Sequence, residues 1–218
     1  MSRIHSLAFA LTVLLSACTP VRGPDVVGSG KMSSETRTVS SFTAVEASGA
    51  FTLEVTSGTA TASVVVEGDD NIVPLFVTEV SGDELSLRMP SGSYSTKTAL
   101  VVRVSAPDVA RVDMSGAIEA VAAGLRGERF DSMMSGSCDL RAQGQVGESH
   151  LSVSGASKIR AFDLTADRVE LALAGSTKAE VHAAQRLIVK ASGASTVRYR
   201  GQPEVESSIS GSGSVRPE

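Results

Sequence analysis

A tripeptide of serine, glycine and a small residue recurs throughout the second half of the chain. The glycines of successive copies are 20, 19, 20, 18 and 18 residues apart, and the fourth copy is the variant Ala-Gly-Ser. These glycines are Gly116, Gly136, Gly155, Gly175, Gly193 and Gly211. A motif that returns at such a regular interval indicates an internal structural repeat. Because a unit of 18 to 20 residues is too short to bury a core of its own, neighbouring units must stack and share one.

The residues at fixed distances from each glycine show which side of the unit is buried. Two residues before it and four after it the side chains are apolar: Met114, Met134, Val153, Leu173, Ala191 and Ile209, then Ala120, Leu140, Ile159, Ala179, Val197 and Val215. Three residues after it they are polar: Glu119, Asp139, Lys158, Lys178, Thr196 and Ser214. This alternation is the pattern of a β-strand with one buried face.

We therefore predict an all-β chain in which residues 108–218 form a right-handed parallel β-solenoid, or β-helix, with repeats of 18 to 20 residues. At a corner of each coil, glycine permits a positive φ or a close approach of stacked backbones. An antiparallel sandwich also fits a series of short strands with turns between them. A sandwich gives no reason for the same three residues to return at a fixed interval, so the solenoid is favoured.

Residues 37–107 also have the pattern of β-strands. Phe51, Leu53 and Val55 alternate with polar residues, and further short β-branched runs are bounded by Gly, Ser, Asp or Pro. The segment 71–80 is ambiguous, but Pro74 argues against a long helix there. We expect an N-terminal β region that leads into the solenoid or caps it, so that residues 37–218 form one continuous domain.

The first 17 residues have the features of a secretory signal peptide. A short basic start with Arg3 precedes an apolar run over 7–15, which is shorter than the roughly 20 residues that span a bilayer. The run ends in Leu15-Ser16-Ala17-Cys18, which resembles the lipobox of bacterial lipoproteins. This predicts cleavage between Ala17 and Cys18 and acylation of Cys18 with palmitate or similar chains. The alternative is an ordinary secretory signal with an incidental cysteine.

Thr19, in place of Asp, resembles an outer-membrane sorting address for such a lipoprotein. Residues 18–36 are rich in Gly, Ser and Pro, and we expect them to form a flexible linker from the lipidated Cys18. The predicted location is the cell envelope, with a lipid anchor in the outer membrane. The second cysteine, Cys138, is expected to be a small apolar filler and not half of a disulfide.

Several segments carry a family resemblance: residues 39–42, residues 45–55 with Ser48-Gly49-Ala50-Phe51, residues 64–72 with Glu67-Gly68-Asp69-Asp70-Asn71, and the Ser-Gly-Ala repeats after Met114. On these segments the chain resembles the auto-transporter adhesin family called the head GIN domain. The resemblance covers most of the chain beyond residue 37. It implies an exported all-β protein with a β-helical part, often lipid-anchored, and it supplies no catalytic residues.

The sequence predicts no metal or other cofactor. His150 and His182 occupy non-equivalent places in the repeat, and no cluster of His and Cys supplies the three or four ligands that zinc requires. Asp69-Asp70-Asn71 could suit calcium, but the twelve-residue calcium loop and the Gly-Gly-x-Gly-x-Asp repeats are absent, so we expect a hairpin turn.

The sequence also predicts no catalytic residues. No Gly-x-Ser-x-Gly motif occurs, and six copies of one tripeptide indicate architecture. Glu119 and Asp139 share a column, but the next two members are lysines, as on an ordinary solvated face. With only 4% aromatic residues the chain also lacks the usual platform for stacking sugars.

We therefore expect a non-enzymatic envelope lipoprotein, an adhesin or structural module that binds the membrane through its anchor and an envelope protein or a glycan through its surface. The alternative is a polysaccharide-processing enzyme on the same scaffold, which would use Glu119 or Asp139. A third possibility is an accessory role in envelope signalling, which the sequence neither supports nor excludes. The formal charge of -4, with dispersed Lys and Arg, gives no footprint for nucleic acid.

Overall fold

The computed structural model describes residues 25–218. Over this part the chain is all-β, as predicted, with fifteen strands and one short 3-10 turn, η1 (Val73–Leu75), in the segment that the sequence left ambiguous. The described residues contain no helix long and apolar enough to cross a membrane. The signal peptide, its cleavage site at Ala17 and the acylation site at Cys18 lie outside the described residues.

Thirteen strands form one large mixed sheet, which is open, and two more form a small parallel pair. The small pair is β1 (Val26–Val27) with β7 (Tyr94–Ser95). The strands of the large sheet are β2 (Met32–Thr38), β3 (Ala44–Ser57), β4 (Ser63–Asp69), β5 (Val77–Ser81), β6 (Glu84–Arg88), β8 (Val101–Ala106), β9 (Arg111–Gly136), β10 (Asp139–Gly155), β11 (Lys158–Gly175), β12 (Lys178–Gly193), β13 (Thr196–Arg200), β14 (Glu204–Ser210) and β15 (Ser214–Pro217).

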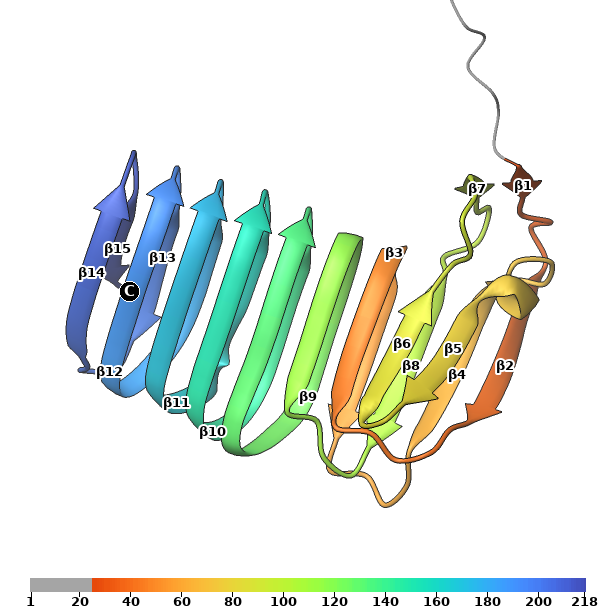
Figure 1. Cartoon of the computed structure of the whole chain (residues 1–218), viewed down its shortest axis with the longest axis horizontal. Helices are drawn as coiled ribbons and strands as arrows, with labels where there is room; N and C mark the ends of the chain where they lie inside the picture. The colour runs from red at the N-terminus through yellow and green to blue at the C-terminus, as the bar shows by residue number, and fades with distance from the viewer. Residues whose placement is uncertain (1–24) are drawn as a thin grey trace, which may run out of the picture.

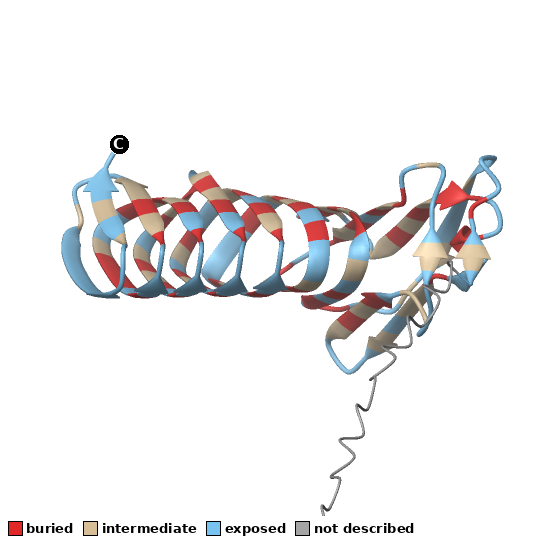
Figure 2. Ribbon diagram, turned by 90° about the horizontal axis from the view of Figure 1, so that it is seen from above, coloured by how far each residue is buried: buried red, intermediate tan, exposed pale blue. Residues whose placement is uncertain are grey.

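Successive units of the repeat lie side by side in β9 to β12 and pair in parallel (Figure 1). The pairing is in register at the repeat glycines: Gly155 is opposite Gly136 on one side and Gly175 on the other, and Gly175 is opposite Gly193. The pairings of β10 with β9 and with β11 each shift register once, and that of β11 with β12 shifts twice. Figure 2 shows the long strands turning back across a narrow interior. The sheet is therefore a stack of bent strands, each resting on the one before.

The repeat includes one unit that the sequence analysis did not assign to it. Strand β3 pairs with β9 in parallel from Ala44 to Thr56, with Gly49 opposite Gly116. Ser48-Gly49-Ala50 is thus a seventh copy of the tripeptide, separated from the others by the strands between β3 and β9. On its other side β3 pairs in parallel with β6 and then with β8. Residues 37–107 therefore contain the first parallel strands of the stack.

Antiparallel strands cover the end of the stack beyond β6 and β8. Strand β5 pairs with β6, and β4 lies between β8 and β2, all antiparallel (Figure 1). This end, which we call the cap, is the one where the described chain begins. The capping role expected for the N-terminal β region corresponds to these strands.

The flexible linker expected over 18–36 is wrong for its second part. From Asp25 onwards the chain is ordered against the cap, because β1 pairs with β7 and β2 pairs with β4 over seven residues. The alternation of Ser, Thr and charged residues in β2 suits a strand that is solvated on one face. Residues 18–24 lie outside the described part of the chain.

One continuous aliphatic core runs from the cap into the last coils. It includes fully buried Leu53, Leu85, Leu140 and Leu171, and near the cap Phe51 meets Phe76 edge-on with ring centroids 5.2 Å apart. Buried and exposed residues alternate along the strands (Figure 2), so the inward columns predicted from the repeat are confirmed over most of the stack. The exceptions are in the last unit, where Val215 is only partly buried and Ile209 is 38% exposed because β14 pairs with β12 alone.

Candidate functional site

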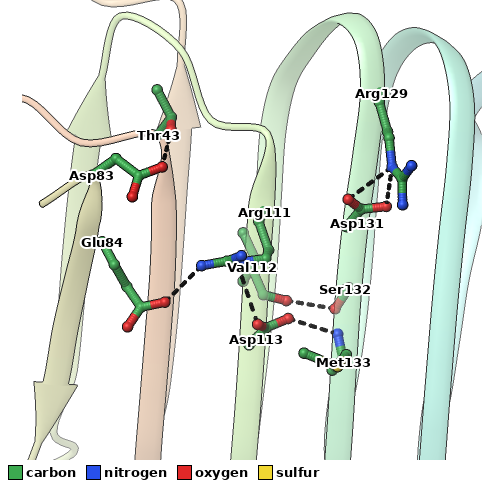
Figure 3. Close-up of polar contacts among 10 residues, drawn as sticks. All are labelled: Thr43, Asp83, Glu84, Arg111, Val112, Asp113, Arg129, Asp131, Ser132 and Met133. Carbon is green, nitrogen blue, oxygen red and sulfur yellow. Dashed lines mark hydrogen bonds and ion pairs between the residues drawn. The ribbon is translucent and has the colours of Figure 1, made fainter.

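The outer surface of the strands that precede the repeat glycines carries ladders of charged residues. We call this the charged face and define it by the positions three, five and seven residues before each glycine. Each layer of the stack is called a rung. Five residues before the glycines, successive rungs carry Arg111, Asp131, His150 and Glu170. Arg111 pairs with Glu84 of β6 at 2.6 Å, and Arg129 pairs with Asp131 at 2.7 Å (Figure 3). Neighbouring charges on this face therefore mostly neutralise one another.

Near the cap, the Asp113 side chain of the charged face and the buried side chain of Ser132 form hydrogen bonds between neighbouring rungs. An oxygen of Asp113 accepts from the Met133 N–H at 2.8 Å, and the Ser132 hydroxyl donates to the Val112 carbonyl (Figure 3). Burial raises the pKa of Asp113, although the Met133 N–H and the Arg111 guanidinium favour its charged form. The side chain of Met133 is left 59% exposed. The rungs are thus joined less regularly here than further along the stack.

Two shallow hollows adjoin this irregular place, and both are lined by Asp113, Met133 and Ser152. One, of about 390 Å³, is charged, with Asp131 and His150 on its walls. The other, of about 350 Å³, is lined in part by serines next to the glycine ladder, Ser115, Ser135 and Ser154, and in part by methionines. Both are open to solvent and could receive polar groups of a surface-bound ligand, but neither encloses one.

His150 lies among carboxylates in the charged hollow. Its Nδ1 is 3.8 Å from Asp131 Oδ1 and its Nε2 is 3.4 Å from Glu148 Oε2, without hydrogen-bond geometry at Nε2. His182 lies elsewhere, beside the hydroxyl of Thr165, so the structure does not bring the two histidines together. Within residues 25–218 no group of His, Cys, Asp and Glu is arranged to hold a metal ion.

Glu119 and Asp139, the candidate carboxylates, are paired on adjacent rungs and the column continues into Lys158 and Lys178. Asp139 forms an ion pair with Arg160 at 2.8 Å. A carboxylate held in this way is a structural partner on a solvated face. Glu119 lies next to Asp139 in this column, and the ion pair with Arg160 keeps Asp139 engaged.

The repeat glycines form a ladder whose role is steric. Their φ values lie between +95° and +113°, a region that residues with a Cβ rarely occupy. A Cβ placed at Gly136, Gly155 or Gly175 would overlap the carbonyl oxygen of the glycine on the preceding rung. The tripeptide therefore recurs along this chain because the stacked backbones approach too closely for a Cβ at its glycine. Chemistry at its serines is not needed to explain the repeat.

A further inward column, two residues after the repeat glycines, was not among the predicted buried positions. Ser157 and Thr177 are buried there, in line with buried Cys138, whose pKa is raised by burial. The Ser157 hydroxyl donates to the Gly136 carbonyl at 3.2 Å and accepts from the Cys138 N–H at 3.1 Å. Strand alternation could have predicted this column. Positions two and four after the glycine differ by two residues, and alternate residues of a strand face the same side.

The second missed feature is a clasp at the cap made by Asp69, Asp70 and Asn71. Asp69 is fully buried and its carboxylate accepts from the backbone N–H groups of Gly30, Lys97 and Thr98 at 2.7, 2.9 and 3.2 Å. The neighbouring side chains of Asp70 and Asn71 hold Ser29. The segment predicted as a hairpin turn thus ties the incoming chain and the loop after β7 to the cap.

Comparison with known proteins agrees with this architecture. A putative adhesin from Bacteroides fragilis NCTC 9343 has a similar structure, with a TM-score of 0.69 and 18% identity over 88% of this chain and 99% of that one. A putative adhesin from Parabacteroides merdae ATCC 43184 gives a TM-score of 0.56 at 17% identity, covering 88% of this chain and 98% of that one.

A putative lipid binding protein from Parabacteroides distasonis ATCC 8503 gives a TM-score of 0.55 at 20% identity, again over 88% of this chain and 98% of that one. No curated protein matches the sequence. The family model described as "Putative auto-transporter adhesin, head GIN domain" matches residues 41–203, from just before β3 to just before β14. The match covers well over half of the chain and includes the glycine ladder up to Gly193, so the chain belongs to this family.

Proposed function

We propose that this protein is a non-enzymatic lipoprotein of the cell envelope that acts as an adhesin or binding module, presenting the surface of a right-handed β-solenoid with repeats of 18 to 20 residues. The observation that carries the proposal is the in-register parallel stacking of β3 and β9 to β12. Stacking fixes the outward side chains in straight ladders before a partner arrives. A partner that spans several rungs then binds with little loss of conformational entropy in the protein.

The anchor in this proposal is Cys18, after removal of residues 1–17, and the site is the outer membrane. Only residues 19–24 separate Cys18 from Asp25, where the ordered cap begins. Six residues reach at most about 20 Å when fully extended. The cap would therefore lie close to the lipid surface, and the stack would extend away from it toward an envelope protein or a glycan. No nucleic acid and no cofactor takes part.

Two measurements test the proposal. Mass spectrometry of the mature N-terminus should find acylated Cys18, and Cys18→Ser should release the protein from the membrane fraction. Cells lacking the protein should adhere less to the surface that wild-type cells colonise, and the wild-type gene should restore adhesion. A pull-down with the protein should capture a specific envelope partner. Unmodified Cys18 would refute the anchor, and unchanged adhesion together with an unchanged set of partners would refute the binding role.

A further inference from the structure

The surface of the strands that follow the repeat glycines differs in charge from the rest of the molecule. We call it the basic face and define it by the outward residues three, five and seven positions after each glycine on β10 to β13 and β15, together with Glu218 and with Asp163, which is opposite Gln143 of this face. Its cations are Arg141, Lys158, Arg160, Lys178, Arg198, Arg200 and Arg216, and its carboxylates are Asp139, Asp163, Glu180 and Glu218. Cations outnumber carboxylates here in a protein whose formal net charge is -4.

The in-register stacking places like charges directly beside one another on this face. Arg141 is opposite Arg160, Lys158 is opposite Lys178, and Arg198 is opposite Arg216. Adjacent rungs of a sheet are only about 4.8 Å apart, so these pairs repel one another. An anionic group placed between two rungs would be attracted by both members of a pair.

Three of the four carboxylates of the basic face are already engaged, while the exposed Asp163 forms no ion pair within the described residues. Asp139 pairs with Arg160 at 2.8 Å, Glu180 pairs with Arg198 at 3.4 Å, and Glu218 pairs with both Arg198 and Arg200. Within the described residues no carboxylate lies within ion-pair distance of four exposed cations, Arg141, Lys158, Lys178 and Arg216. These four remain available to an external anion.

We propose that the basic face binds a linear acidic polysaccharide whose carboxylate groups lie along the stack axis. Six of the seven cations lie in two columns that run along the stack, one of them interrupted by Glu180. Columns in this direction fit a linear polymer, and the spacing of adjacent rungs is close to the length of one sugar ring. The guanidinium groups of Arg141 and Arg216 can each grip a carboxylate with two hydrogen bonds. This inference rests on the proposed function, because it names the ligand class of that binding surface.

Two features favour this ligand over other polyanions. Six large apolar side chains are exposed in the described chain, and none is on the basic face, so nothing there inserts into a lipid bilayer: Val27, Met32, Leu75, Met133, Val205 and Ile209. Unspecific single-stranded nucleic acid binding relies on aromatic platforms that stack bases. Phe162, the aromatic residue in the hollow beside Arg141 and Arg160, is already covered by the Arg200 guanidinium, 4.2 Å from the ring centroid.

The test uses the chain from residue 18 with Cys18→Ser, so that no acyl chain takes part. Its affinity for polygalacturonate is measured by calorimetry beside neutral dextran, phosphatidylglycerol vesicles and single-stranded DNA. We expect binding to polygalacturonate alone, weakened by salt. The double variant Lys158→Gln and Lys178→Gln should raise the Kd about tenfold. The matched control, Lys31→Gln and Lys97→Gln at the cap, removes the same charge and should leave the Kd nearly unchanged.

Arg141→Gln provides a second variant whose effect should point the same way, with folding of each variant checked by its Tm. No binding to polygalacturonate, an equal loss in the cap control, or tighter binding to vesicles or DNA would overturn the inference. The adhesion and pull-down measurements on cells are independent of this experiment. A protein that supports adhesion but ignores polygalacturonate would therefore leave the proposed function intact and refute only the ligand class.

Discussion

At the scale of single residues, the glycine ladder makes the sharpest prediction. Gly155 and Gly127 have the same φ of +113°, but a Cβ at Gly155 meets the Gly136 carbonyl whereas one at Gly127 meets nothing within 4 Å. Gly127→Ala should cost about 1–3 kcal/mol of unfolding free energy from backbone strain alone. Gly155→Ala should cost about 2 kcal/mol more, because two rungs must separate. Urea denaturation measures both, and equal losses would show that close approach is not the constraint.

The charge on Asp113 is predicted to be a cost to the folded state. Burial raises its pKa, so the folded protein gains stability as pH falls from above the folded pKa toward the ordinary value of 3.8. Asp113→Asn keeps an acceptor for the Met133 N–H and should be at least as stable as wild type at pH 7, without this pH dependence. Asp113→Ala removes the acceptor and should lose about 1 kcal/mol. A clear destabilisation by Asn in thermal unfolding would contradict this.

Individual side chains were predictable where strand alternation applies, and not elsewhere. Leu140 and Ile159 are buried as their column requires. Ser157 is buried as strand alternation requires, although serine is a polar residue. Its hydrogen bonds to the neighbouring rung satisfy the buried hydroxyl. Asp69 could not have been found, because its three donors come from Gly30, Lys97 and Thr98, which are distant in sequence and give no local pattern.

At the scale of elements, the clasp holds the segment between β1 and β2 and the loop after β7 through the carboxylate of Asp69. Burial alone would raise the pKa of Asp69. The hydrogen bonds from Lys97, Thr98 and Gly30 together outweigh that effect, so the pKa lies below the ordinary value of 3.8. A depressed folded pKa stabilises the protein above the ordinary value, and this stability is lost as pH falls through the folded pKa. Hydrogen exchange in residues 26–31 should therefore accelerate sharply below about pH 4.

The same acceleration should be absent from Asp69→Asn, in which residues 26–31 exchange quickly already at pH 6. Asp70→Asn is the matched control, because its side chain holds only the exposed Ser29 hydroxyl. Its exchange profile should follow that of wild type. Equal effects of the two variants would show that the clasp acts through general charge and not through the buried acceptor.

The elements themselves were predictable only where the repeat is uninterrupted. From Gly116 to Gly193 a fixed spacing determines which residues lie opposite one another, and parallel pairing follows from it. The place of β3 could not be inferred, because its partner β9 follows after an insertion that breaks the period. Polar composition made residues 25–36 look like a linker, but β2 pairs by backbone hydrogen bonds, which composition does not report.

At the scale of the whole molecule, stability is predicted to be uneven along the stack. Each unit contacts only its neighbours, so the two ends determine where unfolding starts. The end at β3 is covered by antiparallel strands, and Leu53, Val64 and Leu85 there have no exposed surface. At the other end every residue of β14 is exposed. Its strand partner is β12 alone (Figure 1).

Amide hydrogen exchange followed by mass spectrometry should show this gradient in native conditions. We expect β13 to β15 to exchange first, by openings that cost only a fraction of the global free energy, and β3 with the first half of β9 to exchange last. Gly155→Ala should accelerate β11 to β15 more than β3, because it separates the last coils from the covered end. Uniform protection from β3 to β14, or acceleration spread evenly by Gly155→Ala, would mean that the stack unfolds as a single cooperative unit and that its rungs are coupled beyond nearest neighbours.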